Sequence, residues 1–226
     1  MKITDKKYIL FDLDGTITDS APGIVASAKY ALSKFGIYEN DISVLQKFVG
    51  PPLVNAFTEI YGFSREKSIQ AVKYYREYYP DYGIFECTVY DGIRCVFEGL
   101  KKQGKQIILA TAKPELYTQR ILDHFDLAKY FDLVAGSDFE NTRTEKEEII
   151  AYALKQAKIE NTSDCIMVGD RYYDIKGAHV NNIEAIGVLY GYGSKEELNA
   201  LGAEYLVNTV HDLGKLLGVE ICSEEV

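Results

Sequence analysis

Several features that would mark particular classes of protein are absent from this sequence. The 226-residue chain has only four cysteines and three histidines, and neither type occurs with the spacing of zinc ligands. The cysteines are therefore interpreted as reduced packing residues of a cytoplasmic protein. No stretch approaches the roughly 20 apolar residues of a membrane span, and no targeting signal is evident. We expect no zinc site and no membrane partner.

Positive charge is also in short supply. Lysine and arginine number 25 against 34 acidic residues, which gives a net charge of −9. Because phosphate contacts dominate the affinity for nucleic acid, this balance argues against a nucleic-acid polymer as a partner. A small anion is a different case, since one metal ion and one lysine can reverse the potential locally. The absence of a Gly-x-Ser-x-Gly segment removes the usual serine-hydrolase interpretation.

The first informative segment of the sequence is a short apolar run near the N-terminus. Tyr8–Phe11 has the composition of a strand that is buried on both faces of a parallel sheet. Asp12-Leu13-Asp14-Gly15-Thr16 follows it directly. Carboxylates are costly to bury unpaired, and open α/β sheets bind their ligands at the carboxyl ends of strands. Asp14-Gly15 alone is an ordinary turn signal, so its meaning depends on the rest of the chain.

The remaining pattern divides the chain into two parts. Helical periodicity alone fills the segment from about residue 20 to residue 86, whereas strands alternate with helices from residue 90 onward. Such alternation favours a parallel sheet with helices on both faces. We therefore predict an α/β core of residues 1–19 and 88–226, interrupted by a helical lobe of residues 20–87. In the tyrosine-rich end of that lobe, Tyr75 and Tyr79 are expected to pack inward.

Chemically active side chains follow several of the predicted strands. Two unit charges 4 Å apart at an effective dielectric near 20 interact by about 4 kcal/mol, so clustered carboxylates need a compensating cation. A divalent metal bound by oxygens, Mg²⁺ in particular, meets that need. The side chains that we expect at this edge of the sheet are Asp12, Asp14, Thr111, Lys146, Asp170 and Asp174.

These residues resemble the four ordered motifs of the haloacid dehalogenase-like (HAD) hydrolase superfamily. The motifs are Asp12-Leu13-Asp14-Gly15-Thr16, then Thr111, then Lys146, and then Gly169-Asp170-Arg171-Tyr172-Tyr173-Asp174. The phosphoglycolate-phosphatase-like branch is the most similar. The resemblance implies a Rossmann-like parallel-sheet core with an inserted α-helical cap. It also implies a Mg²⁺-dependent phosphatase that hydrolyses a small phosphomonoester metabolite.

The resemblance further implies a role for each motif residue. Asp12 would be the nucleophile that forms an aspartyl-phosphate, and the Asp14 side chain would be the general acid and then the general base. Mg²⁺ would be bound by Asp12, by the backbone carbonyl of Asp14 and by Asp170. Asp174 would lie next to these ligands without being a direct one. The phosphoryl group would be held by Thr111, by the backbone N–H of Ala112 and by Lys146.

Some alternatives stay open at the level of residues. Arg143 and Lys113 are rivals of Lys146 for the cation beside the phosphate. A capping box over Thr144-Glu145-Lys146-Glu147 would place Lys146 in the first turn of a helix, where a cation is mildly disfavoured. Asp170 and Asp174 could simply begin a helix. Gly191-Tyr192-Gly193 lacks the third glycine of a nucleotide-binding loop and predicts a plain turn.

Alternatives also remain for the activity. Phosphoglycolate, a nucleoside monophosphate, a sugar phosphate and pyrophosphate are all compatible substrates. A phosphomutase would use the same nucleophile and return the phosphoryl group to a sugar. A non-catalytic regulator that binds phosphate or Mg²⁺ is the alternative from another class, although such a protein has no need of Asp14. The chain could act as a monomer or a homodimer.

Overall fold

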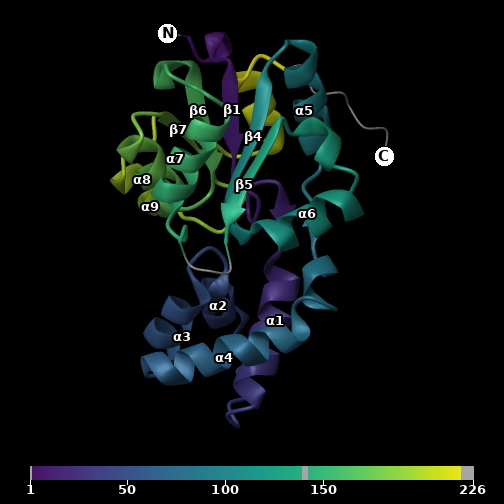
Figure 1. Ribbon diagram of the computed structural model, residues 1–226, viewed down its shortest axis with the longest axis vertical. Coiled ribbons are helices and arrows are strands. Elements are labelled where there is room, and N and C mark those ends of the chain that lie inside the picture. Colours follow the sequence, from purple (N-terminus) through teal and green to yellow (C-terminus); the bar gives the residue numbers. More distant parts are fainter. Residues whose placement is uncertain (1, 139–141, 220–226) are drawn as a thin grey trace. The chain divides into compact units, whose positions relative to one another are not determined.

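The chain folds into two compact units, which the computed structural model describes over residues 2–138 and 142–219 (Figure 1). One unit comprises Met1–Thr18 and Val89–Val226, and the other comprises Asp19–Thr88. Within the described residues, no helix has the length and apolar character to cross a membrane. Cys87, Cys95 and Cys165 form no disulfide among the described residues, and Cys222 lies outside those residues.

The first unit is built on a parallel sheet of six strands in the order β5-β4-β1-β6-β7-β8. The central strand β1 is the predicted apolar run, with β4 and β6 as its neighbours. The expected α/β fold with a parallel sheet is confirmed. The strands are β1 (Tyr8–Phe11), β4 (Gln106–Pro114), β5 (Leu133–Ser137), β6 (Cys165–Gly169), β7 (Glu184–Val188) and β8 (Tyr205–Val207).

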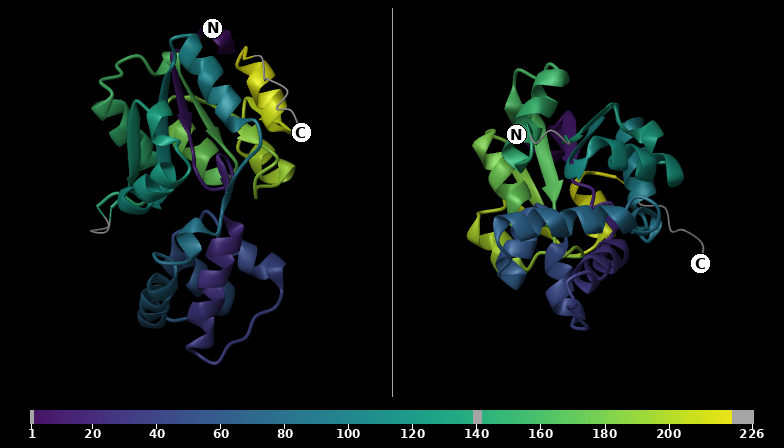
Figure 2. Two further views of the ribbon diagram at one scale, coloured as in Figure 1. Left: turned by 90° about the vertical axis from the view of Figure 1, so that its right-hand side faces the viewer. Right: turned by 60° about the horizontal axis from the view of Figure 1, so that its bottom comes forward.

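Helices cover both faces of this sheet (Figure 2). Successive strand residues point to opposite faces, so Leu10 packs with the apolar residues of α7 and α8, whereas Phe11 meets Phe97 of α5 edge to face at 5.2 Å. The helices of this unit are α5 (Ile93–Lys102), α6 (Glu115–His124), α7 (Lys146–Gln156), α8 (Tyr172–Val180), α9 (Lys195–Ala200) and α10 (Val210–Leu216). Its short 3-10 helices are Ile3–Asp5, Ala128–Tyr130 and Thr162–Asp164.

Strand β4 is longer than its sequence pattern predicts. The apolar pattern ends at Thr111, but pairing continues to Pro114, which lies opposite Ser137 of β5. The register shifts between Ala110 and Pro114, so the strand bends where its polar residues begin. Thr111 and Lys113 lie between the paired residues Ala110 and Pro114, in the irregular part of the strand.

The second unit consists mainly of helices. Ser64 caps α4 through its hydroxyl, and Gly62 ends α3 in the left-handed conformation with φ 64°. Tyr75 and Tyr79 are buried and stack on each other, which confirms that they pack inward. The elements are α1 (Ala21–Ser33), α2 (Ile42–Leu45), α3 (Leu53–Tyr61), α4 (Arg65–Tyr78) and the 3-10 helices Gln46–Phe48 and Gly83–Phe85. A two-stranded sheet of β2 (Thr18–Asp19) and β3 (Thr88–Val89) lies where the chain leaves and re-enters the first unit.

Candidate active site

The site begins at the end of β1. Asp12 follows the strand directly, and its N–H donates to the carbonyl of Val168 on the neighbouring strand β6. The chain then turns sharply, with the carbonyl of Leu13 accepting from three following N–H groups and with Gly15 at φ 85°. This turn holds the backbone beside Asp12 and leaves the Asp14 side chain partly exposed, at 14%.

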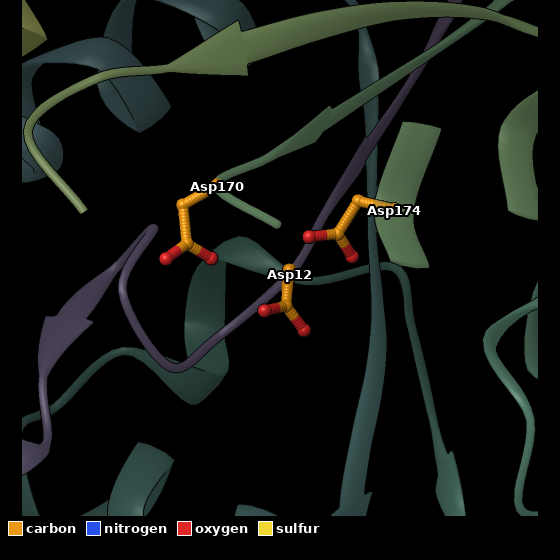
Figure 3. Close-up of side chains that lie close together, drawn as sticks. All are labelled: Asp12, Asp170 and Asp174. Carbon is orange, nitrogen blue, oxygen red and sulfur yellow. The ribbon is translucent and has the colours of Figure 1, made fainter. Parts of the chain in front are cut away.

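Three buried carboxylates converge here from two neighbouring strands. Asp170 follows β6 directly, and Asp174 lies in the first turn of α8, where its Oδ2 accepts from the N–H of Arg171 at 3.1 Å. One ligand atom from each of Asp12, Asp170 and Asp174 lies within 4.8 Å of the others (Figure 3). The figure shows the three side chains close together, with the carboxylate of Asp174 extending toward Asp12. Asp170 and Asp174 therefore do more than begin a helix.

Lys146 is the ammonium group of this cluster. Its Nζ lies 2.6 Å from Oδ1 of Asp12, 2.8 Å from Oδ1 of Asp174 and 3.0 Å from the carbonyl oxygen of Ala110. An ammonium group has three hydrogens, so three protein oxygens can take all of them. The structure places Lys146 against the carboxylates, and any contact with a phosphate would require it to exchange one of these partners.

The helix that carries Lys146 begins one residue later than the sequence pattern indicates. A capping box starting at Thr144 is wrong, because the cap residue is Glu145 and its reciprocal partner is Glu148. The Glu148 carboxylate accepts from the N–H groups of both Thr144 and Glu145, so one side chain satisfies two donors. Lys146 is thus the first helical residue. The helix dipole disfavours a cation at this position, and the contacts with the carboxylates of Asp12 and Asp174 offset that cost.

The two rival cations have different surroundings. The Lys113 Nζ is buried and lies 3.1 Å from Oδ2 of Asp14, so this lysine also belongs to the site. Arg143 instead donates to the carbonyl of Gly136 and to Glu115, and its guanidinium lies 3.6 Å from the ring centre of Tyr152. The structure therefore brings Lys146 and Lys113 to the carboxylates and gives Arg143 other partners.

The expected phosphate-binding residues lie on the extended end of β4. Thr111 is buried, and its hydroxyl oxygen accepts from the N–H of Lys113 at 3.2 Å, which leaves the hydroxyl proton to donate elsewhere. Ala112 is half-buried. Both residues directly follow Ala110, whose carbonyl contacts Lys146. The backbone thus holds Thr111 and Ala112 next to the cluster.

The electrostatics of the cluster suit a divalent cation. The three carboxylates and the one ammonium have a formal charge of −2 in a buried site. Burial raises the pKa of Asp12 to about 7 although Lys146 opposes the shift, and burial raises the pKa of Asp170 well above its usual range. Oδ1 of Asp170 is buried without a hydrogen-bond partner among the described residues. An oxygen-only donor set with this charge and an unpartnered oxygen fits Mg²⁺.

One contact of the site was not foreseen from the sequence. The backbone N–H of Tyr192 donates to Oδ2 of Asp170 at 2.8 Å. The segment that was expected to be a plain turn therefore lies against an acidic residue of the cluster. Its only signal in the sequence is the pair of glycines that flank Tyr192, which indicates a close approach of backbone but not to which group.

Comparisons with known proteins show which proteins this chain is similar to. The family model described as haloacid dehalogenase-like hydrolase matches residues 9–188. A 5'-nucleotidase of Pseudomonas aeruginosa is 42% identical over 85% of this chain and 86% of its own length. The tyrosine-protein kinase PtkA of Mycobacterium tuberculosis is 33% identical over 94% of this chain and 73% of its own length. The crystal structure of a predicted phosphatase from Clostridium acetobutylicum superposes with a TM-score of 0.89 at 49% identity, covering 92% of this chain and 96% of that one.

The matched segment includes all four motifs, and it covers residues 9–18 and 89–188 of the first unit. The family model covers well over half of the chain, and the relatives exceed 30% identity across most of it. The enzyme class implied by the sequence motifs is confirmed. The chain belongs to the haloacid dehalogenase-like hydrolases.

Proposed function

We propose that this protein is a Mg²⁺-dependent phosphatase that hydrolyses a small phosphomonoester through an aspartyl-phosphate on Asp12. The observation that carries the proposal is the meeting of Asp12, Asp170 and Asp174 in a buried cluster that has a formal charge of −2 with Lys146, which contacts Asp12 and Asp174. The sequence similarity to a 5'-nucleotidase and the structural similarity to a predicted phosphatase support the same activity.

Asp12 and Asp170 would hold the cation together with the backbone carbonyl of Asp14, and Asp174 would act through Lys146. The cation would offset the repulsion between the Asp12 carboxylate and a phosphate dianion. Lys146 would keep one oxygen of Asp12 oriented, as its 2.6 Å contact with Oδ1 suggests. A nucleophile held in this way loses little orientational freedom on reaction.

Asp14 would transfer the protons. Lys113 holds its Oδ2, whereas its Oδ1 is buried without a hydrogen-bond partner among the described residues. That oxygen is available to protonate the leaving group and then to accept a proton from the attacking water. Thr111 and the N–H of Ala112 would bind the oxygens of the phosphoryl group, which carry its negative charge during transfer.

The substrate would be a small phosphate ester. The similarity to a 5'-nucleotidase makes nucleoside monophosphates the first compounds to test, followed by phosphoglycolate, sugar phosphates and pyrophosphate. The relative named as a tyrosine-protein kinase raises transfer to an acceptor other than water as a second candidate. A phosphomutase is distinguished by its need for a bisphosphate activator.

We further propose that the helical unit serves as the cap that selects the substrate. It is inserted between the two halves of the catalytic unit, in the position that the family motifs imply. Exchange of this unit for that of a relative is expected to change the order of preferred substrates while metal binding is retained. An unchanged order would argue that selection lies within the α/β unit.

The test of the activity is the release of inorganic phosphate from a panel of phosphate esters with Mg²⁺ and with EDTA. We expect turnover that EDTA abolishes and that Asp12→Asn removes. Asp126→Asn is a matched control, because Asp126 is an exposed residue paired with Lys129 and has a positive φ that asparagine tolerates. Phosphate release by Asp12→Asn at the wild-type rate would refute the proposed nucleophile.

A further inference from the structure

The loop that follows β7 is tied to two different parts of the site. The hydroxyl of Tyr190 donates to the carbonyl of Thr16 at 3.0 Å, in the turn after β1. The N–H of Tyr192 donates to Oδ2 of Asp170, the residue after β6. The ring of Tyr190 also packs edge to face against Tyr90, with 4.9 Å between ring centres. Residues 190–193 therefore connect the turn beside the nucleophile with one of the buried acids.

The two glycines of this loop are required because there is no room for a Cβ atom at either position. A Cβ on Gly191 would overlap the carbonyl oxygen of Gly15 and the Cβ of Asp170. A Cβ on Gly193 would overlap the carbonyl oxygen of Asp170. Neither glycine has a positive φ, so backbone conformation does not explain them. Since most of these obstacles are backbone atoms, an alanine at either position has to displace the loop or Asp170 itself.

The loop leaves the two oxygens of Asp170 in different states. Oδ2 is held by the Tyr192 N–H and lies so close to Gly15 that a Cβ there would overlap it. Oδ1 is buried and has no hydrogen-bond partner among the described residues. A carboxylate with one oxygen held by the protein and one unpartnered is arranged as a monodentate ligand, and such supporting contacts tune the affinity for metal.

We propose that residues 190–193 form a positioning clamp that holds one oxygen of Asp170 so that the other is presented to a divalent cation. Tyr192 supplies the N–H, Gly191 and Gly193 allow the close approach, and Tyr190 anchors the loop. These are positioning residues, since they act through Asp170 and do not touch the cation. The clamp rests on the proposed function, because it presupposes that Asp170 is a metal ligand.

The decisive change removes only the N–H of Tyr192. Incorporation of the α-hydroxy acid analogue of tyrosine at this position replaces the amide N–H by an ester oxygen and keeps the side chain. The matched control is the same replacement at Tyr130, whose N–H donates to the carbonyl of Leu127. Gly193→Ala is the genetic counterpart. Its control is Gly187→Ala on β7, where a Cβ would meet only side-chain atoms of Leu206 and Leu198 at 2.7 and 2.9 Å.

Binding of Mn²⁺ to the metal-free protein is measured from the electron paramagnetic resonance signal of free Mn²⁺. Loss of a supporting contact of a metal ligand typically weakens binding by about 10- to 100-fold, and we expect this for the Tyr192 ester and for Gly193→Ala. Both controls are expected to bind as the wild type does. Tyr190→Phe keeps the ring but loses the hydroxyl. We expect it to weaken Mn²⁺ binding by a smaller factor than the Tyr192 ester does.

Turnover gives a second measurement that a general folding defect would not reproduce. At saturating Mg²⁺ the ester variant is expected to regain most of its kcat with an unchanged KM for substrate, because only the affinity for the cation is impaired. Wild-type Mn²⁺ affinity in both the ester and the Tyr190→Phe variants would overturn the clamp and leave the proposed function intact. Equal Mn²⁺ binding by the wild type and Asp170→Asn would overturn the proposed metal site and the clamp with it.

Discussion

Replacing Lys146 by methionine tests the charge balance of the buried cluster. The substitution keeps an unbranched side chain of similar length and removes the ammonium that contacts Asp12 and Asp174. Three buried carboxylates then remain without this counter-charge in the metal-free protein. We expect a large loss of stability that Mg²⁺ partly restores, because a divalent cation can compensate for the missing ammonium.

The expected magnitude follows from the two short contacts. At 2.6 and 2.8 Å each pair contributes about 6 kcal/mol of attraction at an effective dielectric near 20. Burying the ammonium offsets several kcal/mol of this, and removal of one partner of a buried pair typically costs about 3–5 kcal/mol. For a chain of this length that loss lowers the Tm by about 6–20 °C.

The pH dependence provides an independent check of the cause. Burial already raises the pKa of Asp12 to about 7, and loss of Lys146 raises it further. A carboxyl with a raised pKa keeps its proton in the folded state while the unfolded state loses it near pH 4, so stability falls as the pH rises toward the folded pKa. The variant's loss of stability is therefore expected to be smaller at about pH 5.5 than at about pH 8.

The assay is thermal unfolding in EDTA and in Mg²⁺ at both pH values. Lys176→Met is the matched control, since Lys176 is an exposed residue that pairs with Glu147 at 3.0 Å. Exposed pairs of this kind contribute at most about 1 kcal/mol. A Tm of Lys146→Met in EDTA equal to that of the control would refute the view that Lys146 neutralises the cluster.

Three further predictions concern the chemistry. Asp12→Asn is expected to retain the fold by circular dichroism and to show no phosphoenzyme, because the amide cannot attack phosphorus; a phosphoenzyme in this variant would move the nucleophile elsewhere. Asp14→Asn is expected to slow poor leaving groups more than good ones in an aryl phosphate series, and equal losses would contradict its acid role. Because burial raises the pKa values of Asp12 and Asp170, Mg²⁺ is expected to displace protons and to bind more tightly as the pH rises from about 6 to about 8. Calorimetry in buffers of different ionisation enthalpy measures that release, and a pH-independent affinity would argue against it.

Much of the fold was predictable because its signals are local. The apolar run at β1 and the alternation of strands and helices after residue 90 were sufficient for a parallel sheet. The carboxyl ends of parallel strands meet at one edge, so the convergence of Asp12 and Asp170 also followed from the pattern. What the pattern did not contain was the end of β4, because pairing with Ser137 extends that strand through polar residues.

The partners of the long side chains could not be predicted from spacing. Lys113 lies at the end of β4, Arg143 and Lys146 follow the neighbouring strand β5, and the directions of their side chains separate the three. The structure directs Lys146 to Asp12 and Lys113 to Asp14, and it directs Arg143 to Glu115. The role of the loop at residues 190–193 was equally hidden, because a glycine that allows close approach does not reveal its neighbour.

The most direct measurement is a crystal structure of the protein with Mn²⁺ and beryllium trifluoride, which mimics a phosphoryl group on a carboxylate. The anomalous signal of Mn²⁺ is expected between Asp12 and Asp170, with the trifluoride bonded to Asp12. A trifluoride on another side chain, or Mn²⁺ bound away from these carboxylates, would contradict the proposed site.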